Sequence, residues 1–186
     1  MGYILGIDEA GRGAWAGPLV VGAVILGDKK IKGLTDSKLL TREQRQEFAE
    51  AIHASCLFYG LGWVSSKEVD SRGLTSATKL GIKRAIKNLA VENLEIIIDG
   101  NINYLSTRKD SRCVIKADLT IPAVSAAGII AKVARDRYMI ELADKFPVFG
   151  FDSHVGYGTS RHSENLKKHG ICREHRLSFN PVSLFI

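Results

Sequence analysis

The segment Leu94–Asp99, Leu-Glu-Ile-Ile-Ile-Asp, restricts the fold of this chain more than any other feature. Successive side chains of a β-strand point to opposite faces of the sheet, so three isoleucines in a row have to be covered on both faces. Such strands are typical of the centre of a sheet that helices cover on either side. The segment therefore predicts an α/β protein.

The remaining strands and helices are predicted in an order that fits this class. Two apolar runs around a Gly-rich turn predict neighbouring strands over Tyr3–Asp8 and Leu19–Leu26. An Ala- and Gly-rich stretch after Pro122 predicts a long, closely packed helix over about Ala123–Phe146. The other predicted elements are a helix from Thr41 to about Ser55, a strand over Leu57–Val64, helical stretches from Ser65 and over Leu80–Leu89, a strand over Cys113–Lys116 and a basic helix over Ser163–His169. We expect a mixed sheet flanked by helices, followed by a helical C-terminal extension.

Length and composition fit one globular domain. At roughly 150 residues per domain, the 186 residues predict a single domain over residues 1–186, in which about 147–186 form a C-terminal substrate-binding extension. With 45% hydrophobic and 25% charged residues, the chain is neither disordered nor fibrous. Lys and Arg number 26 and Asp and Glu 20, and the net charge of +6 favours a polyanionic partner.

Cysteine spacing and hydropathy indicate a reducing compartment and no membrane. Cys56, Cys113 and Cys172 lie far apart and form no C-x-x-C pair, so neither a disulfide framework nor a zinc site is predicted. The longest apolar stretch, Pro18–Leu26, is much shorter than the roughly 20 residues that span a bilayer. We expect a cytoplasmic protein.

Acidic residues follow the ends of three predicted strands. Asp8 and Asp99 end two of them, Glu9 follows Asp8, and Asp118 closes the third. If the first two strands are parallel neighbours, their acids meet at the sheet edge where open α/β proteins hold ligands. Clustered carboxylates need a cation, and Mg²⁺ or Mn²⁺, used in pairs for phosphodiester hydrolysis, suit such oxygen ligands.

Acids at strand ends do not always form a metal site. Asp favours turns at strand ends for structural reasons alone. Asp8 and Glu9 also face opposite sides of a regular strand, unless the glycines that follow let the backbone bend. No serine, cysteine, Walker or dinucleotide motif is present. The C-terminal third carries histidines that we expect at the surface or on phosphate rather than on a metal: His154, His162, His169 and His175. It also carries basic residues that fit either a phosphate-binding face or an ordinary solvated face: Lys167, Lys168, Arg173 and Arg176.

Ordered motifs along nearly the whole chain resemble one enzyme family. They are Gly6–Gly13 (Gly-Ile-Asp-Glu-Ala-Gly-Arg-Gly) with Ala16–Pro18, Asp36–Lys38 with Leu40–Thr41, Ile98–Gly100, Lys116–Asp118, Ser125–Ala127 through Ala131–Val133 to Arg135–Arg137, Gly156–Tyr157 with Thr159, and Ser178–Phe179. A lone Asp-Glu pair would carry little weight, whereas this series is specific. The chain resembles ribonuclease HII, the type 2 ribonuclease H family.

The resemblance implies a ribonuclease H-like fold and a hydrolase that acts on RNA–DNA hybrids and on single ribonucleotides embedded in duplex DNA. It implies two-metal hydrolysis with Mg²⁺ or Mn²⁺, cutting 5′ of the ribonucleotide and leaving 3′-hydroxyl and 5′-phosphate ends. The family's metal-binding and catalytic carboxylates correspond to Asp8, Glu9, Asp99 and Asp118. Its substrate-binding residues correspond to Gly11, Arg12 and Gly13 in a loop at the ribonucleotide, Tyr157 at the RNA–DNA junction and Lys38 near the substrate.

The family match also predicts how RNA is distinguished from DNA. Backbone groups of Gly11, Arg12 and Gly13 are candidates for reading the 2′-hydroxyl, because glycine lets the main chain approach a sugar. The Arg12 side chain would then be free to contact a phosphate. We expect the ring of Tyr157 to pack against a sugar.

Some positions depart from the family pattern without removing an acid. Ala14-Trp15 stands where Pro and a small or aliphatic residue are common, Val155 where a basic residue often precedes Gly-Tyr, and Gly128 where Ser is usual. Trp15 and Val155 are therefore positions at which affinity or substrate preference could differ. Asp136 lies in a family motif, either as a surface ion-pair partner of Arg135 or Arg137 or as a catalytic group.

The sequence leaves two other functions open. One is an inert nucleic-acid-binding module, which the four acids argue against, and the other is a metal-dependent DNA nuclease of the same type of fold. The related ribonuclease HIII carries an added N-terminal domain, and this chain starts directly at its first predicted strand, which favours HII. We expect a monomer.

Overall fold

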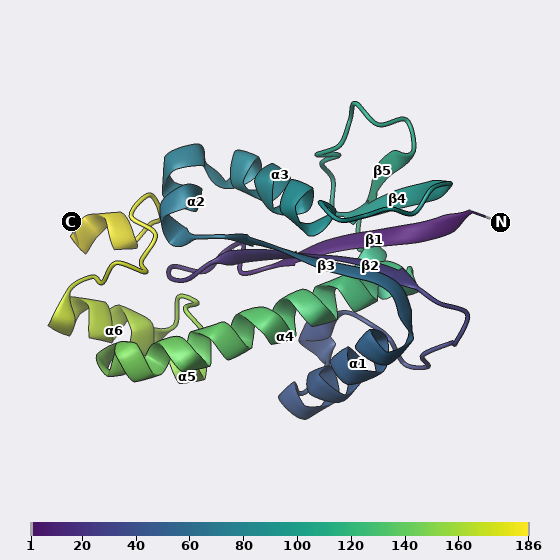
Figure 1. The fold of residues 1–186 in the computed structure, drawn as a ribbon. Coiled ribbons are helices and arrows are strands. Elements are labelled where there is room, and N and C mark those ends of the chain that lie inside the picture. Colours follow the sequence, from purple (N-terminus) through teal and green to yellow (C-terminus); the bar gives the residue numbers. More distant parts are fainter. Residues whose placement is uncertain (1, 186) are drawn as a thin grey trace.

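A five-stranded mixed sheet forms the centre of the computed structural model, which describes residues 2–185 (Figure 1). Its strands are β1 (Tyr3–Ala10), β2 (Leu19–Leu26), β3 (Cys56–Val64), β4 (Leu94–Asp99) and β5 (Ser111–Val114). The strand order is β3-β2-β1-β4-β5. β4 is parallel to β1 and β5, and β2 is antiparallel to β1 and β3. The predicted mixed sheet is confirmed, and β1 and β4 are the parallel neighbours that a meeting of Asp8 and Asp99 requires.

Helices cover both faces of this sheet. They are α1 (Arg42–Ser55), α2 (Ser66–Arg72), α3 (Leu74–Ala85), α4 (Pro122–Lys145), α5 (Phe151–His154) and α6 (Ser160–His169), with 3₁₀ turns η1 (Ser37–Leu39), η2 (Ala117–Leu119), η3 (Pro147–Phe149) and η4 (Val182–Phe185). Figure 1 shows α1 and α4 on one face and α2 and α3 on the other. Capping boxes begin α1 and α2, where the side chains of Thr41 and Ser65 accept bonds from Gln44 and Glu68.

Strand β4 is buried on both faces, as its isoleucines predict. Ile96 and Ile98 belong to the cluster that β1, β2 and α3 form on one face of the sheet. Ile97 packs on the opposite face with Val124 of α4. The sheet is therefore the middle layer of a helix–sheet–helix arrangement.

Helix α4 lies very close to the sheet because strand glycines face it. A Cβ on Gly6 would overlap the backbone of Ala123, and one on Gly22 would overlap that of Ala127. Asp8 lies on the same face as Gly6, so the middle of α4 is held against it. Although α4 is 24 residues long, no helix within residues 2–185 is long and apolar enough to cross a bilayer.

The C-terminal extension is helical and gathers at one end of the sheet (Figure 1). The histidines expected at the surface are buried at His154, His162 and His175, and only His169 is exposed. The rings of His154 and His162 stack with centroids 4.4 Å apart, and the Nε2 atoms of His162 and His175 are 3.1 Å apart. That expectation was wrong because neutral imidazole packs like other aromatic rings when its nitrogens find partners.

Candidate active site

Asp8 and Glu9 stay in a regular strand and point to opposite faces. β1 remains in register with β2 to its last residue, so the expected backbone bend does not occur before the strand ends. The Asp8 carboxylate lies against Gly128 of α4, whereas Arg12 contacts Glu9 at 3.5 Å on the other face. Pairing between β1 and β4 ends just before Asp8, which leaves this part of β1 open at its side. The two acids therefore border one sheet edge from opposite faces.

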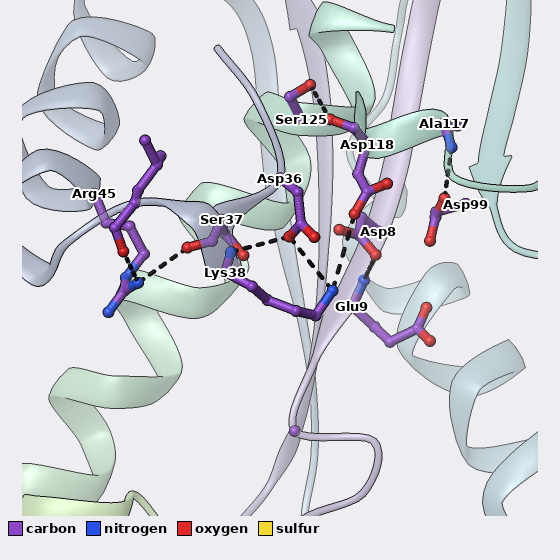
Figure 2. A network of polar contacts seen from close by, with 12 residues as sticks. Asp8, Glu9, Asp36, Ser37, Lys38, Arg45, Asp99, Ala117, Asp118 and Ser125 are labelled. Carbon is purple, nitrogen blue, oxygen red and sulfur yellow. Dashed lines mark hydrogen bonds and ion pairs between the residues drawn. The ribbon is translucent and has the colours of Figure 1, made fainter. Parts of the chain in front are cut away.

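Asp99 and Asp118 complete this group of acids (Figure 2). Asp99 is the last residue of β4, and its Oδ1 accepts a 2.8 Å bond from the N–H of Ala117. Asp118 lies in η2, four residues beyond the end of β5 and not at the strand end itself. The hydroxyl of Ser125 donates a 2.6 Å bond to the Asp118 main-chain carbonyl, which ties η2 to α4. We name Asp8, Glu9, Asp99 and Asp118 the acidic edge.

Burial and like charge disfavour ionisation of Asp8, Glu9 and Asp118 at the acidic edge. Burial is the main cause that raises the pKa of Asp8 well above its ordinary 3.8, and the charges of Glu9, Asp99 and Asp118 raise it further. Burial also raises the pKa of Glu9, against the opposing charge of Arg12. The pKa of Asp118 is raised by burial and by Asp99. A cation would relieve the repulsion among these groups.

The donor set suits a hard divalent cation, although the side chains do not yet surround one point. All four donors are carboxylates, which Mg²⁺ and Mn²⁺ prefer. Across residues 2–185, no three Asp, Glu, His or Cys side chains lie close enough together to hold one ion as they stand. Asp8 and Glu9 extend from opposite faces, so shared coordination requires their carboxylates to rotate toward the edge between them.

Besides Arg12 at Glu9, the structure brings the cation Lys38 to the acidic edge. It belongs to η1, and its Nζ lies 3.4 Å from Asp36 Oδ1 and 3.9 Å from Asp118 Oδ2 (Figure 2). Desolvation lowers the pKa of Lys38, but the charges of Asp36, Asp8 and Asp118 outweigh it and raise the pKa. Lys38 thus carries its charge beside two acids.

The loop after β1 meets Tyr157, which is 146 residues away in sequence. The N–H of Gly11 donates a 3.2 Å bond to the Tyr157 hydroxyl. Gly11 is buried with φ of +85°, and a Cβ there would overlap Arg135. Gly13 is exposed, and a Cβ there would meet no atom within 4 Å. The two glycines therefore differ. The fold requires a glycine at position 11, whereas Gly13 faces open space.

The Arg12 side chain is anchored. Its Nη1 donates to the hydroxyls of Tyr104 at 2.9 Å and Thr78 at 3.2 Å, in addition to its contact with Glu9. Polar groups of α3 and of the segment after β4 thus hold Nη1, while the side chain remains 37% exposed, and its contact with a phosphate stays a prediction.

Two buried arginines hold the loop between β1 and β2, and the sequence analysis did not predict this role for them. Arg135 of α4 donates to the carbonyls of Pro18 at 2.8 Å and Ala16 at 3.1 Å. Arg176 donates twice to the carbonyl of Gly17, at 2.9 and 3.1 Å. Both side chains are fully buried, and burial lowers the pKa of Arg176 to about 9. No motif shows that an arginine will bind distant carbonyls, so the sequence gives no signal for this role.

Asp136 forms an ion pair, but with a partner that was not predicted. Its Oδ1 lies 2.8 Å from Lys132 Nζ, one turn earlier on α4, and the residue is 7% exposed. Arg135, one of the expected partners, points into the protein instead, and Arg137 pairs with Glu141. The helical i,i+4 spacing of Lys132 and Asp136 was the available signal.

The three departures from the family pattern lie next to functional candidates. A Cβ on Gly158 would overlap the Trp15 indole, so Trp15 covers the turn that carries Tyr157. Val155 in the same segment has φ of +43°, a left-handed conformation that β-branched residues rarely adopt. Gly128 leaves room for the Asp8 carboxylate.

Sequence comparisons place this geometry in a known family. The family model described as ribonuclease HII matches residues 5–182. Curated ribonuclease HII proteins from Burkholderia thailandensis and Burkholderia mallei are each 44% identical over 181 residues, covering 96% of this chain and 84% of the relative.

Solved structures are similar over almost the whole chain. Ribonuclease H2 from Pyrococcus horikoshii has a TM-score of 0.82 at 28% identity, covering 98% of this chain and 96% of that one. Ribonuclease HII from Archaeoglobus fulgidus, solved in complex with PCNA, has a TM-score of 0.80 at 31% identity, covering 95% of both chains. Bst-RNase HIII in complex with Mn²⁺ shares the fold, with a TM-score of 0.73 at 22% identity over 97% of this chain and 68% of that one. The chain is a ribonuclease H hydrolase and belongs to the ribonuclease HII family.

Proposed function

We propose that the protein cleaves the RNA strand of RNA–DNA hybrids and cuts 5′ of single ribonucleotides in duplex DNA, with Asp8, Glu9, Asp99 and Asp118 as the ligands of Mg²⁺ or Mn²⁺. The observation that carries this proposal is the gathering of four carboxylates at one sheet edge, where burial and like charge raise the pKa of three of them. Like-charge repulsion of this kind is relieved by cations. Family membership supplies the ribonuclease H activity that such a site would perform.

Bound divalent cations, two of them in our proposal, would lower the pKa of water and stabilise charge on the leaving 3′ oxygen. The chain's own residues fix where that chemistry takes place. Ala117 orients Asp99, and Ser125 orients the turn that carries Asp118. Lys38 brings a positive charge to the same edge, where a phosphodiester would need it.

Recognition of the ribonucleotide is assigned to the loop of Gly11, Arg12 and Gly13. The N–H of Gly11 binds Tyr157, and the carbonyl of Arg12 accepts a 3.1 Å bond from Arg176. The N–H groups of Arg12 and Gly13 have no acceptor within residues 2–185. Because Gly13 has no Cβ and faces open space, a sugar can approach these two amides. They are the groups that we assign to the 2′-hydroxyl.

The C-terminal extension is proposed to bind the duplex. Tyr157 is half-buried, and its ring lies 5.3 Å from Lys132 Nζ and 5.2 Å from the Arg135 guanidinium. The ring would pack on a sugar at the RNA–DNA junction. Exposed Lys167 and Lys168 on α6 offer charge to phosphates. We infer that one copy of the chain, acting as a single domain, is sufficient.

Three labelled duplexes of one sequence test this proposal: an RNA–DNA hybrid, a DNA duplex with one ribonucleotide, and an all-DNA duplex. With Mg²⁺ or Mn²⁺, the parent is expected to cut the hybrid, to cut the second duplex once on the 5′ side of the ribonucleotide, and to leave the third whole. Asp99→Asn should cut none of them. The matched control is Asp28→Asn, which removes one exposed carboxylate elsewhere.

Two outcomes of this experiment would contradict the proposal. Near-parental cleavage by Asp99→Asn would remove the acidic edge from the mechanism. Equal cleavage of the all-DNA duplex would favour the alternative of a general metal-dependent DNA nuclease.

A further inference from the structure

Arg45 of α1 ties the Lys38 turn to the rest of the fold (Figure 2). Its Nη1 donates to the main-chain carbonyls of Ser37 at 2.9 Å and Leu40 at 2.6 Å. These two carbonyls flank Lys38 in the sequence. One guanidinium nitrogen therefore fixes both ends of the short turn that carries the lysine.

Asp36 restrains the same lysine from the start of the turn. Its Oδ1 accepts a 2.9 Å bond from the Lys38 N–H and lies 3.4 Å from the Lys38 ammonium. The Lys38 side chain is 78% exposed, so packing does not hold it in place. A lysine stem has high rotamer entropy, and the position of its backbone therefore decides where the ammonium spends its time.

We propose that Arg45 is a positioning residue that keeps the Lys38 ammonium at the acidic edge. This inference rests on the proposed function and deepens it. An ammonium 3.9 Å from Asp118 attracts a phosphodiester and opposes the entry of a metal cation at that carboxylate. Lys38 therefore has two measurable effects of opposite sign, and Arg45 should influence both through Lys38 alone.

The chain provides a matched control on the same helix. Arg42 lies at the start of α1, is exposed and carries the same charge as Arg45. Arg45→Met and Arg42→Met thus remove equal charge, but only the first removes the bonds to Ser37 and Leu40. Arg45→Lys keeps a cationic donor there and should restore most of the parental behaviour.

The first measurement is binding of an RNA–DNA hybrid in EDTA, at several salt concentrations, so that no cleavage occurs. Lys38→Met should weaken binding and make the slope of log affinity against log salt shallower by about one, the value for one lost phosphate contact. Arg45→Met should weaken binding about fivefold, the size of one charge contact. Arg42→Met should weaken it less.

The double variant separates positioning from general damage. If Arg45 acts through Lys38, the pair Lys38→Met and Arg45→Met should bind the hybrid as Lys38→Met does alone. A merely structural role would make the two losses multiply. Thermal unfolding of each variant shows that folded proteins are compared. If Arg45→Met does not fold, Arg45→Gln, which removes the charge and shortens the side chain, takes its place with Arg42→Gln as its control.

The second measurement is a calorimetric titration of Mn²⁺ without substrate. Lys38→Met should bind Mn²⁺ more tightly than the parent, and Arg45→Met should shift in the same direction by less. The inference is overturned if Arg45→Met equals Arg42→Met in both assays, or if its loss multiplies with that of Lys38→Met. Absence of Mn²⁺ binding in the parent would instead overturn the proposed function.

Discussion

The acidic edge and the histidines of the C-terminal extension bury titratable groups in opposite ways. At the acidic edge, burial and neighbouring negative charge raise the pKa of Asp8. Among the histidines, burial lowers the pKa of His162 and of His175 to about 4, so both rings are neutral at physiological pH. The histidines bind one another and the backbone, as in the 2.9 Å contact between His162 Nδ1 and the Tyr157 carbonyl.

This difference shows which buried titratable groups indicate a candidate active site. The histidine nitrogens find partners in one another and in the backbone, and the rings pack within the protein. His162 also contacts the main-chain carbonyl of Tyr157. Arg12 at Glu9 and Lys38 at Asp118 reduce the repulsion among the acids only in part, and an added cation would reduce it further. Unrelieved charge, and not burial alone, therefore distinguishes the candidate active site.

The largest effect is expected from Asp8→Asn. Metal ions contribute several kcal/mol to the transition state, so the loss of a ligand should lower hybrid cleavage on the order of a thousandfold. The same change should leave the metal-free protein folded and equally or more stable, because it removes like charge. Cleavage rates and urea unfolding in EDTA measure the two quantities. Parental cleavage together with lower stability would make Asp8 a structural residue like the histidines.

Acid should destabilise the C-terminal extension. The unfolded chain binds protons at His162 and His175 below pH 6.5, whereas the folded protein does so only near 4. Their stabilising contribution is therefore complete above about 6.5 and is lost as pH falls toward 4, by on the order of 3 kcal/mol per histidine at most. The contribution of Asp8 to stability changes with pH in the opposite direction, because its pKa is raised in the folded protein. This contribution is complete below the unfolded pKa of 3.8 and is lost as the pH rises through the higher folded pKa.

Unfolding of the parent and of His162→Gln in EDTA, at pH 5 and pH 7, measures the histidine contribution. The stability difference between the two pH values should shrink in the variant, which cannot titrate at position 162. An unchanged difference would mean that His162 does not contribute as described.

Two glycines in one loop should respond differently to the same substitution. Gly11→Ala places a Cβ on Arg135 and forces a left-handed conformation, so it should destabilise the protein by at least about 1–2 kcal/mol. Gly13→Ala should change stability by less than about 0.5 kcal/mol, and it should still weaken cleavage at a single ribonucleotide. Melting curves and cleavage rates test both. Parental cleavage by Gly13→Ala would remove this residue from the substrate contact.

The smallest effect is expected from Tyr157→Phe. This change removes one bond from the Gly11 N–H, worth about 1 kcal/mol or roughly fivefold in cleavage at a single ribonucleotide. Tyr157→Ala should lose far more, because it also removes the ring that would pack on the sugar. Equal rates for parent, Phe and Ala variants would leave Tyr157 as a structural residue of the histidine-rich extension.

Local sequence patterns predicted the sheet well, and they placed Asp8 and Asp99 on neighbouring parallel strands. The isoleucines of β4 specify burial on both faces, and the capping box at Thr41 fixes the start of α1. Boundaries without such signals were less accurate. The helix expected over Leu80–Leu89 is α3, which begins at Leu74 and ends at Ala85, because a preceding glycine, Gly73, separates it from α2.

Long-range polar contacts could not be predicted from the sequence. Arg135 and Arg176 resemble surface residues in a sequence, yet they are buried because carbonyls distant in the chain accept from them. The contacts of Arg12 with Tyr104 and Thr78 escaped prediction for the same reason, since both partners are distant in sequence. Spacing shows which residues share an element, whereas these contacts depend on how the elements pack.

The most direct test of the acidic edge is calorimetric titration of Mn²⁺ into substrate-free protein. The parent and Asp28→Asn should bind Mn²⁺ and unfold at a higher temperature when it is present. Asp8→Asn should lose both the binding heat and the thermal shift while it remains folded. Parental Mn²⁺ binding by Asp8→Asn, or no binding by the parent, would contradict the assignment of these carboxylates to a metal site.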